Sequence, residues 1–392
     1  MNVFKGQVAA PSKNKVAYLI TNAFFICSGF TYAIWGVHIA VIDKKFSLNK
    51  AELTWLLFAM ALGAILTMGP AGRTISKIGS ARTCQIGGAL LALSTMCIMI
   101  TPHYLLLIAV LFIYGSTTSI FDTAMNAQAV TVEKALNKSC LSSMHGMFSL
   151  GGMLGAFAAS IWIGQQLPSW LLFFITALIT ATVAILGSLN LLSDSTHNIE
   201  LNAIKTSEKN YTLIALGFLS FLGLLVEGAM YDWTSIYMRD IVKSETSWIG
   251  SGYAGFCIGM ILGRFNGDRV RTTFGNLPVL VASGIIASTG IVCVLVFPFT
   301  LIAIAGFSLA GLGGANFVPV LFSVASKNKS LPPSEAIALV ARLGYFGFLL
   351  GPVLIGYIAN YFGLPVAFLM VGFFALIIAV SAPKLMGDKN LY

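Results

Sequence analysis

Charge is scarce in this chain: only 9% of its 392 residues are Asp, Glu, Lys or Arg, whereas 57% are hydrophobic. Ordinary soluble domains carry roughly 25% charged residues. A water-soluble fold cannot bury so large an apolar excess, so the composition predicts a protein that folds in a lipid bilayer. The net charge of +9 does not indicate nucleic-acid binding, because the Lys and Arg residues fall in short loops.

The motifs of several other protein classes are missing. The six cysteines lie in or beside apolar segments without CxxC or metal-ligand spacing, so we expect no disulfide framework and no metal site. The histidines are equally scattered, which argues against a membrane enzyme. No GxxxxGK[ST] motif occurs, so ATP-driven transport by this chain alone is not expected, and no cofactor is predicted.

Long apolar runs, by contrast, recur along the whole chain. About 20 apolar residues form a helix of about 30 Å that crosses the hydrocarbon core. Such runs predict an all-α protein with twelve transmembrane helices over 16–41, 51–71, 83–100, 104–133, 140–164, 168–192, 211–237, 247–265, 277–297, 299–325, 334–359 and 363–383. The polar segment 193–210 predicts a cytoplasmic linker between two six-helix bundles, 1–192 and 211–392. Residues 1–15 are polar and the following run is long enough to span, so we expect the first helix to remain as an anchor.

The basic residues predict the orientation of these helices. One side would hold both termini and most Lys and Arg, with Arg264 counted in one of its loops. The opposite side would hold five: Lys44, Lys45, Lys50, Arg239 and Lys243. The positive-inside rule then predicts that both termini lie in the cytoplasm.

The two halves contain similar short segments. "ELTW" (52–55) opens the second span and "ETSW" (245–248) opens the eighth, while "GMFSLGGMLG" (146–155) and "RLGYFGFLLG" (342–351) occupy the fifth and eleventh. Parallel six-helix repeats joined by a linker resemble the major facilitator superfamily. That resemblance implies a cavity lined by spans one, four, seven and ten, and transport by alternating access.

Asp122 lies deep in the predicted fourth span, about 16 Å from the cytoplasmic turn at 1.5 Å per residue. A charged residue at the centre of a span costs about 3 kcal/mol or more, so it is usually functional. Asn126 follows one turn later on the same face and is a candidate solute contact. We predict that Asp122 exchanges a proton during transport; a structural hydrogen bond between helices is the alternative.

Several segments resemble known transporters. "DTAMN" (122–126) resembles the E-T-A-x-N stretch of the fucose–proton symporters, whose acid takes part in proton and sugar coupling, although Asp122 has a shorter reach than Glu. Over most of its length the chain resembles the YbjJ-type branch of bacterial transporters. The segments that carry this resemblance are "LNKSCLSSMHGMFSLG" (136–151), "EGAMYDW" (227–233), "YAGF" (253–256) and "GRFNG" (263–267). The resemblance implies a proton symporter of a sugar or sugar-like solute in a bacterial inner membrane.

The segment "EGAMYDW" supplies further candidates on the seventh span. Glu227 lies about 24 Å along it and is predicted to be a second proton-coupling residue, with a packing role as the alternative. Tyr231 stands one turn further on and is a candidate solute contact. Asp232 is a candidate contact at the outer rim, or a hydrated carboxylate paired with Arg239.

Other polar residues within spans have two open interpretations. Trp35 and His38 are candidate solute contacts, or an interfacial aromatic residue and a solvated or capping histidine. Arg342 either reaches the inner surface with its long side chain or pairs with Asp122 or an anionic solute. The resemblance makes Asn316 of the tenth span a cavity-wall residue, although the adjacent glycines can simply allow packing or bending.

The segment 72–82 resembles the facilitator signature between spans two and three. Gly72, Lys77 and Gly79 fit this signature, whereas Ser76 replaces its aspartate, so the charge relay is incomplete. Arg82 ends this segment. The corresponding segment of the C-terminal half, near Asp268 and Arg269, matches the signature less closely. These three residues complete the set of predicted gating residues. Lys77 and Arg82 also satisfy the positive-inside rule without any gating role.

These observations predict a secondary transporter, not an enzyme, in which protons drive a small polar solute inward. A proton-coupled efflux antiporter with the same fold is the alternative, and a sensor that binds solute without moving it is a third possibility. The expected partners are the solute, protons and the lipid bilayer, with no nucleic acid, and we expect a monomer.

Overall fold

The computed structural model describes residues 13–138, 140–193, 211–328 and 331–386. Its regular elements are α-helices and one short 3₁₀ helix: α1 (Lys13–Phe46), α2 (Lys50–Ile78), α3 (Ser80–Ile100), α4 (Tyr104–Leu136), α5 (Leu141–Gly164), α6 (Ser169–Ser188), α7 (Tyr211–Asp240), η1 (Thr246–Trp248), α8 (Ser251–Phe274), α9 (Asn276–Val296), α10 (Thr300–Gly314), α11 (Phe317–Ala325), α12 (Pro333–Phe362) and α13 (Leu364–Met386).

The helices confirm the predicted all-α membrane fold. Within the described residues, eleven segments are long and apolar enough to cross a membrane, with α10 and α11 counted together. The remaining predicted span is α8, which is equally long but less apolar because its second half carries Arg264, Asp268, Arg269 and Arg271. Together these segments make up the twelve predicted spans.

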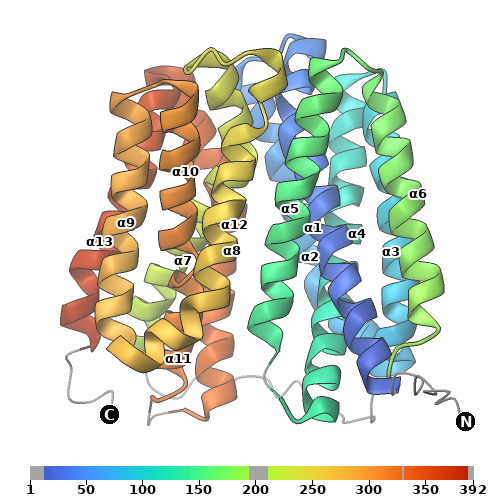
Figure 1. The fold of residues 1–392 in the computed structure, drawn as a ribbon, viewed down its shortest axis with the longest axis vertical. Helices are drawn as coiled ribbons and strands as arrows, with labels where there is room; N and C mark the ends of the chain where they lie inside the picture. Colours follow the sequence, from blue (N-terminus) through green and yellow to red (C-terminus); the bar gives the residue numbers. More distant parts are fainter. Residues whose placement is uncertain (1–12, 139, 194–210, 329–330, 387–392) are drawn as a thin grey trace, which may run out of the picture.

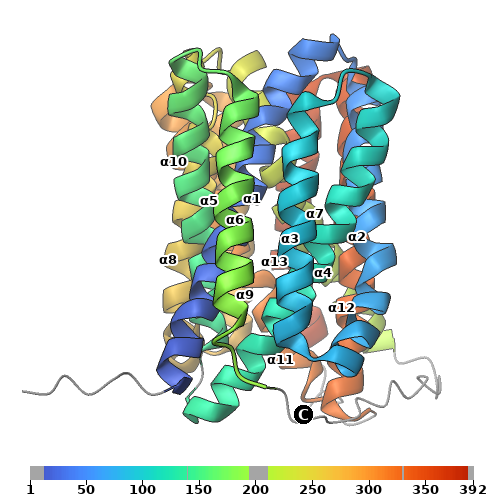
Figure 2. The same cartoon turned by 90° about the vertical axis from the view of Figure 1, so that its right-hand side faces the viewer.

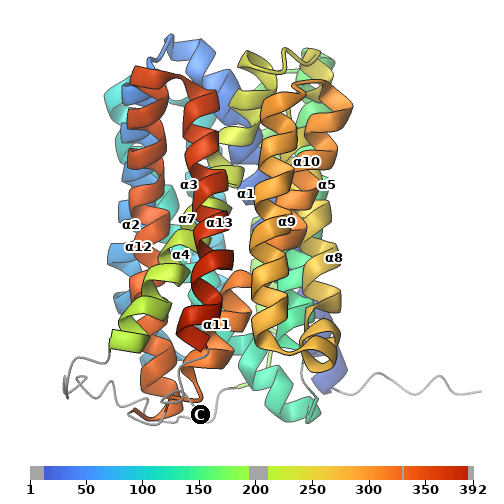
Figure 3. The same ribbon diagram turned by 90° about the vertical axis from the view of Figure 1, so that its left-hand side faces the viewer.

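The helices run roughly parallel as two groups (Figure 1). Helices α1–α6 lie on one side and α8–α13 on the other, and the turned views show the same packing from each flank (Figures 2 and 3). The start of α1 and the end of α13 lie at the same end of the bundle, called the terminal end below. The α1–α2 and α7–α8 connections lie at the opposite, distal end. Residues 194–210 of the predicted linker fall outside the described residues.

Glycine stripes pack the two halves in the same way. A Cβ at Gly151 of α5 would lie 2.0 Å from the Ile26 carbonyl oxygen of α1, and a Cβ at Gly347 of α12 would lie 2.2 Å from the Phe221 carbonyl oxygen of α7. Only glycine permits such an approach of two backbones. The repeated segments of spans five and eleven therefore have equivalent packing roles.

The tenth predicted span, 299–325, is confirmed as one spanning segment over 300–325, but it consists of two helices, α10 and α11, where a single helix was expected. Ala315 and Asn316 form a turn between α10 and α11, in which Asn316 N donates a 3.4 Å hydrogen bond to the Gly313 backbone oxygen, three residues back instead of four. Four glycines between 306 and 314 weaken the helix before the break. Pro319 cannot donate a backbone hydrogen bond, and it occupies the first turn of α11, where no such bond is needed.

Candidate functional site

Asp122 lies near the middle of α4 and faces α1. Ser28 Oγ of α1 donates a hydrogen bond of 2.7 Å to Asp122 Oδ1. Within the described part of the chain, no Lys, Arg or His forms an ion pair with this carboxylate. Asn126 Nδ2 donates to the Asp122 backbone oxygen at 2.8 Å, which leaves Asn126 Oδ1 as an acceptor. Both side chains are partly exposed.

Glu227 of α7, in contrast, is held by two partners. Arg264 Nη2 lies 3.0 Å from Glu227 Oε1, and the side chains of Arg264 and Glu227 are 15% and 12% exposed. Tyr231 OH donates a hydrogen bond of 3.1 Å to the same oxygen. The assignment of Arg264 to a cytoplasmic loop was wrong, because it lies within α8, about 20 Å from its first residue.

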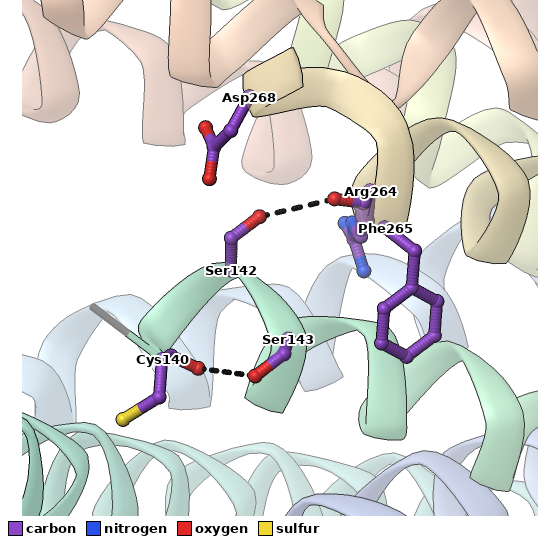
Figure 4. A pocket seen from close by; sticks show the side chains of 6 residues that line it. All are labelled: Cys140, Ser142, Ser143, Arg264, Phe265 and Asp268. Carbon is purple, nitrogen blue, oxygen red and sulfur yellow. Dashed lines mark hydrogen bonds between the residues drawn. The ribbon is translucent and has the colours of Figure 1, made fainter. Parts of the chain in front are cut away.

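Arg264 also connects the two halves. Its Nη1 donates to the His145 backbone oxygen at 3.2 Å and to Ser149 Oγ at 2.8 Å, both on α5. In return, Ser142 Oγ donates to the Arg264 backbone oxygen at 3.2 Å. Figure 4 shows this region, where Arg264, Phe265 and Asp268 of α8 face the start of α5 across a pocket of about 130 Å³.

An aromatic cluster closes the centre on the distal side. The Tyr231 ring centroid lies 5.6 Å from that of Tyr32 on α1, and 5.4 Å and 5.3 Å from those of Tyr253 and Phe256 on α8. A Cβ at Gly36 would lie 2.9 Å from the Tyr231 backbone oxygen, so α1 and α7 cross closely at this level. The cluster therefore packs the two halves together next to Asp122 and Glu227.

Four charged residues join the halves at the distal end. Lys50 Nζ of α2 lies 3.1 Å from Asp240 Oδ2 of α7 and 3.7 Å from Asp43 Oδ2 of α1. Arg239 of α7 pairs with Asp43 and, at 2.6 Å, with Asp240 Oδ1. We call this set the distal ion network. Sequence patterns did not single out these residues together, because their partners come from different helices.

Three predicted solute contacts are more deeply buried than expected. Asp232 is only 4% exposed and is not at a hydrated rim, and Arg239 pairs with the distal ion network instead. His38 is fully buried, its ring 5.0 Å from that of Phe173 on α6, so it is neither solvated nor next to Asp122. Trp35 is also fully buried, 6.3 Å from the Tyr114 ring, which rules out an interfacial position.

The other predicted wall residues lie apart from the acids. Asn316 lies between α10 and α11, where its Oδ1 would be 2.7 Å from a Cβ at Gly267 of α8. Arg342 on α12 is exposed, and within the described residues no ion pair links it to Asp122. Tyr345, one turn further on, is 39% exposed and within electrostatic range of both Asp122 and Glu227. Sequence analysis missed Tyr345, which lies in the repeated glycine segment.

The predicted gating segments form tight turns at the terminal end. Gly79 (φ 84°) ends α2 and Gly275 (φ 84°) ends α8, both in the left-handed region that favours glycine. Lys77 and Arg82 are exposed around the first turn, as is Arg269 near the second, whereas Gly72 is half-buried. Asp268 pairs with Arg271, which also donates to the Pro319 backbone oxygen at 3.1 Å.

Known proteins resemble this chain over nearly its whole length. The profile of the Major Facilitator Superfamily matches residues 20–335. An uncharacterized MFS-type transporter of Yersinia pestis is 33% identical, covering 92% of this chain and 93% of that protein. Membrane protein MosC of Rhizobium meliloti is 31% identical, covering 95% and 90%.

Solved structures share the fold at low sequence identity. A mutant of the nucleoside transporter NupG superposes with a TM-score of 0.76 at 12% identity, covering 93% of this chain and 99% of that one. A bacterial homologue of the human lysosomal transporter Spinster, inward-facing and occupied, gives 0.73 at 14% identity, with coverage of 97% and 98%.

Proposed function

Because the chain belongs to the major facilitator superfamily, it is a multi-pass membrane transporter, and we propose that it couples proton movement to the import of a small hydroxylated solute, such as a sugar. Asp122 would carry the proton. Glu227, which the sequence predicts as a second proton-coupling residue, is paired with Arg264, so we assign it, together with Asn126, to contact with the solute. The relatives that share its length are themselves named as transporters or a membrane protein. We also propose that it works as a monomer, because one chain supplies both Asp122 and Glu227, and that it lies in a bacterial inner membrane, because the relatives are bacterial proteins.

The environment of Asp122 carries this proposal. Its hydrogen-bond partner is the neutral Ser28, and no cation among the described residues is paired with it. A carboxylate without a counter-charge in the middle of a membrane protein is stabilised when it takes up a proton or when water or a polar solute reaches it. Asp122 is partly exposed, so water and solute can reach it.

The free polar groups of the centre favour a solute rich in hydrogen-bond donors. Asp122 Oδ2, Glu227 Oε2 and Asn126 Oδ1 are acceptors, whereas Nη1 and Nη2 of Arg264 already donate to α5 and to Glu227. Hydroxyl groups of a sugar-like molecule would pair with such acceptors. The neighbour NupG is a nucleoside transporter, and nucleosides are also hydroxylated.

The charge distribution supports cytoplasmic termini. At the distal end, Lys50 and Arg239 are neutralised by the distal ion network, and Lys45 Nζ donates to the Met99 and Thr101 backbone oxygens at 3.2 and 3.0 Å. At the terminal end, Lys77 and Arg82 are exposed and form no ion pair with another described residue. This surplus of free positive charge is typical of a cytoplasmic face.

Burial along α1 and α7 supports a state closed toward the outside. Residues 33–40 of α1 and 228–238 of α7 are all buried, at the distal side of the acids. At the terminal end of α7, Tyr211 and Phe218 are 76% and 54% exposed. With the termini in the cytoplasm, the continuous burial of α1 and α7 fits a transporter whose halves are joined at the outer side, in addition to the α5–α8 contact that Arg264 makes nearer the terminal end.

The test is transport by the purified protein in liposomes. Candidate sugars, organic acids, amino acids and vitamins are first screened by thermal shift, and each hit is tested for counterflow. A proton gradient, acidic outside, should then drive accumulation of the hit in right-side-out vesicles, and a protonophore should abolish it. Accumulation only when the gradient drives export would instead support the efflux antiporter, and saturable binding without counterflow would contradict transport.

A further inference from the structure

Arg264 occupies an unusual position, because it binds Glu227 in its own half and α5 in the other half. Its guanidinium makes the 3.0 Å contact with Glu227 through Nη2 and the two bonds to His145 and Ser149 through Nη1. One planar group therefore joins three helices. An Arg side chain suits this role because its donors point in fixed directions.

The α5–α8 interface around Arg264 is tightly packed. A Cβ at Gly146 would lie 2.9 Å from the Phe265 ring, and a Cβ at Gly152 would lie 2.9 Å from Cys257 Sγ. Ser149 is fully buried. A helix can separate from such a close partner only if the polar bonds across the contact are released as well.

We infer that Arg264 is a positioning residue through which Glu227 controls whether α5 and α8 can separate at the terminal end. With Glu227 charged and free of solute, the carboxylate holds the guanidinium between α7 and α5. A proton or a solute hydroxyl on Glu227 weakens that hold and lets Arg264 leave Ser149 and the His145 carbonyl. The inference relies on alternating access between the two halves and needs no knowledge of the solute.

The test measures the distance between the halves by electron paramagnetic resonance. Spin labels are attached at Lys134→Cys on the last turn of α4 and Thr273→Cys on the last turn of α8, both exposed, after replacement of the native cysteines. The first label reports on α5 because Glu133 Oε2 accepts hydrogen bonds from the Cys140 and Leu141 backbone nitrogens at 2.8 and 2.9 Å.

The measured quantity is the ratio of molecules in which α5 and α8 are separated to molecules in which they are in contact. We expect Arg264→Gln and Glu227→Gln each to raise this ratio at least about fivefold, because coupling between two sites usually amounts to a factor of about five or more. The decisive variant combines the two substitutions. Since Glu227 acts through Arg264, the double variant should show no larger ratio than Arg264→Gln alone. If Glu227→Gln raises the ratio equally with and without Arg264, the inference is wrong.

Two further variants keep the result interpretable. Arg271→Gln removes another arginine of α8. The partners of Arg271 are Asp268 and Pro319, which both lie in the C-terminal half, so this substitution should leave the ratio unchanged. Ser149→Ala removes a single Arg264 bond and should raise the ratio less than Arg264→Gln; it decides the question if Arg264→Gln does not fold. An unchanged ratio in Ser149→Ala and Glu227→Gln would overturn the inference. No solute or proton gradient is used, so failure here is separate from failure of the proposed transport function.

Discussion

The surroundings of Asp122 and Glu227 differ although both acids lie in the central layer of the bundle. Asp122, in the N-terminal half, meets the neutral Ser28, whereas Glu227, in the C-terminal half, meets Arg264 and Tyr231. An acid without a counter-charge is suited to exchange a proton, whereas an acid paired with arginine stabilises packing and position. The two acids are therefore expected to respond differently to the same chemical change.

Asp122→Asn should have the largest effect, on transport. Moving one elementary charge across the membrane with a potential of about 100 mV releases about 2.3 kcal/mol. If one proton moves with each solute molecule, this energy supports a ratio of inside to outside solute concentration of about 50-fold. We expect proton-driven accumulation to fall by about that factor, while solute exchange persists because the amide keeps the shape and part of the hydrogen bonding. Both are measured in liposomes with a solute found by counterflow.

The matched control for this change is Glu245→Gln, an acid-to-amide substitution at an exposed residue of the distal end. It should accumulate solute as the unmodified protein does. Normal accumulation by the Asp122→Asn variant would remove Asp122 from proton coupling.

Glu227→Gln should have the largest effect on stability. Removing one partner of a buried ion pair costs about 3–5 kcal/mol, and the slight exposure of this pair reduces the expected cost to about 2 kcal/mol. Thermal unfolding in detergent, followed by tryptophan fluorescence, should show a clearly lower midpoint. Asp122→Asn should shift it little, since no counter-charge is lost.

The control for Glu227→Gln is its combination with Arg264→Met, which leaves no charge unpaired. Stability should then recover partly or fully. Equal destabilisation by Glu227→Gln and Asp122→Asn would show that the two surroundings do not differ as described.

Tyr231→Phe should have a smaller effect. It removes the 3.1 Å hydrogen bond to Glu227 and keeps the ring against Tyr32, so we expect a loss of about 1 kcal/mol in unfolding free energy. Measured in the Glu227→Gln background, the same substitution should cost less, because the charged acceptor is gone. An equal cost in both backgrounds would place the contribution of Tyr231 in packing alone.

Ser28→Ala should have the smallest effect of the four. Asp122 is partly exposed, so a water molecule can replace the Ser28 hydroxyl at a cost of about 0.5 kcal/mol or about twofold in transport rate. Proton-driven accumulation should persist, because the carboxylate itself is unchanged. Loss of accumulation in the Ser28→Ala variant would instead make the hydrogen bond part of the coupling mechanism.

Much of the architecture could be predicted from local sequence. Each apolar run must satisfy its own backbone hydrogen bonds in lipid, so its length alone indicates a spanning helix. For the same reason, the depth of Asp122 and its shared face with Asn126 followed from helix geometry. The break at Asn316 was harder to locate, because a glycine cluster permits either packing or bending.

Sequence alone determined the helical spans, the two-part arrangement and the presence of a carboxylate in the membrane interior, since these depend on residues close together in the chain. Only the tertiary structure decided which acid has a counter-charge: Arg264 reaches Glu227 from another helix, and Asp43 reaches Arg239 in the other half. Such pairings depend on how helices distant in sequence lie beside one another, and one apolar run carries no information about its neighbour's register or rotation.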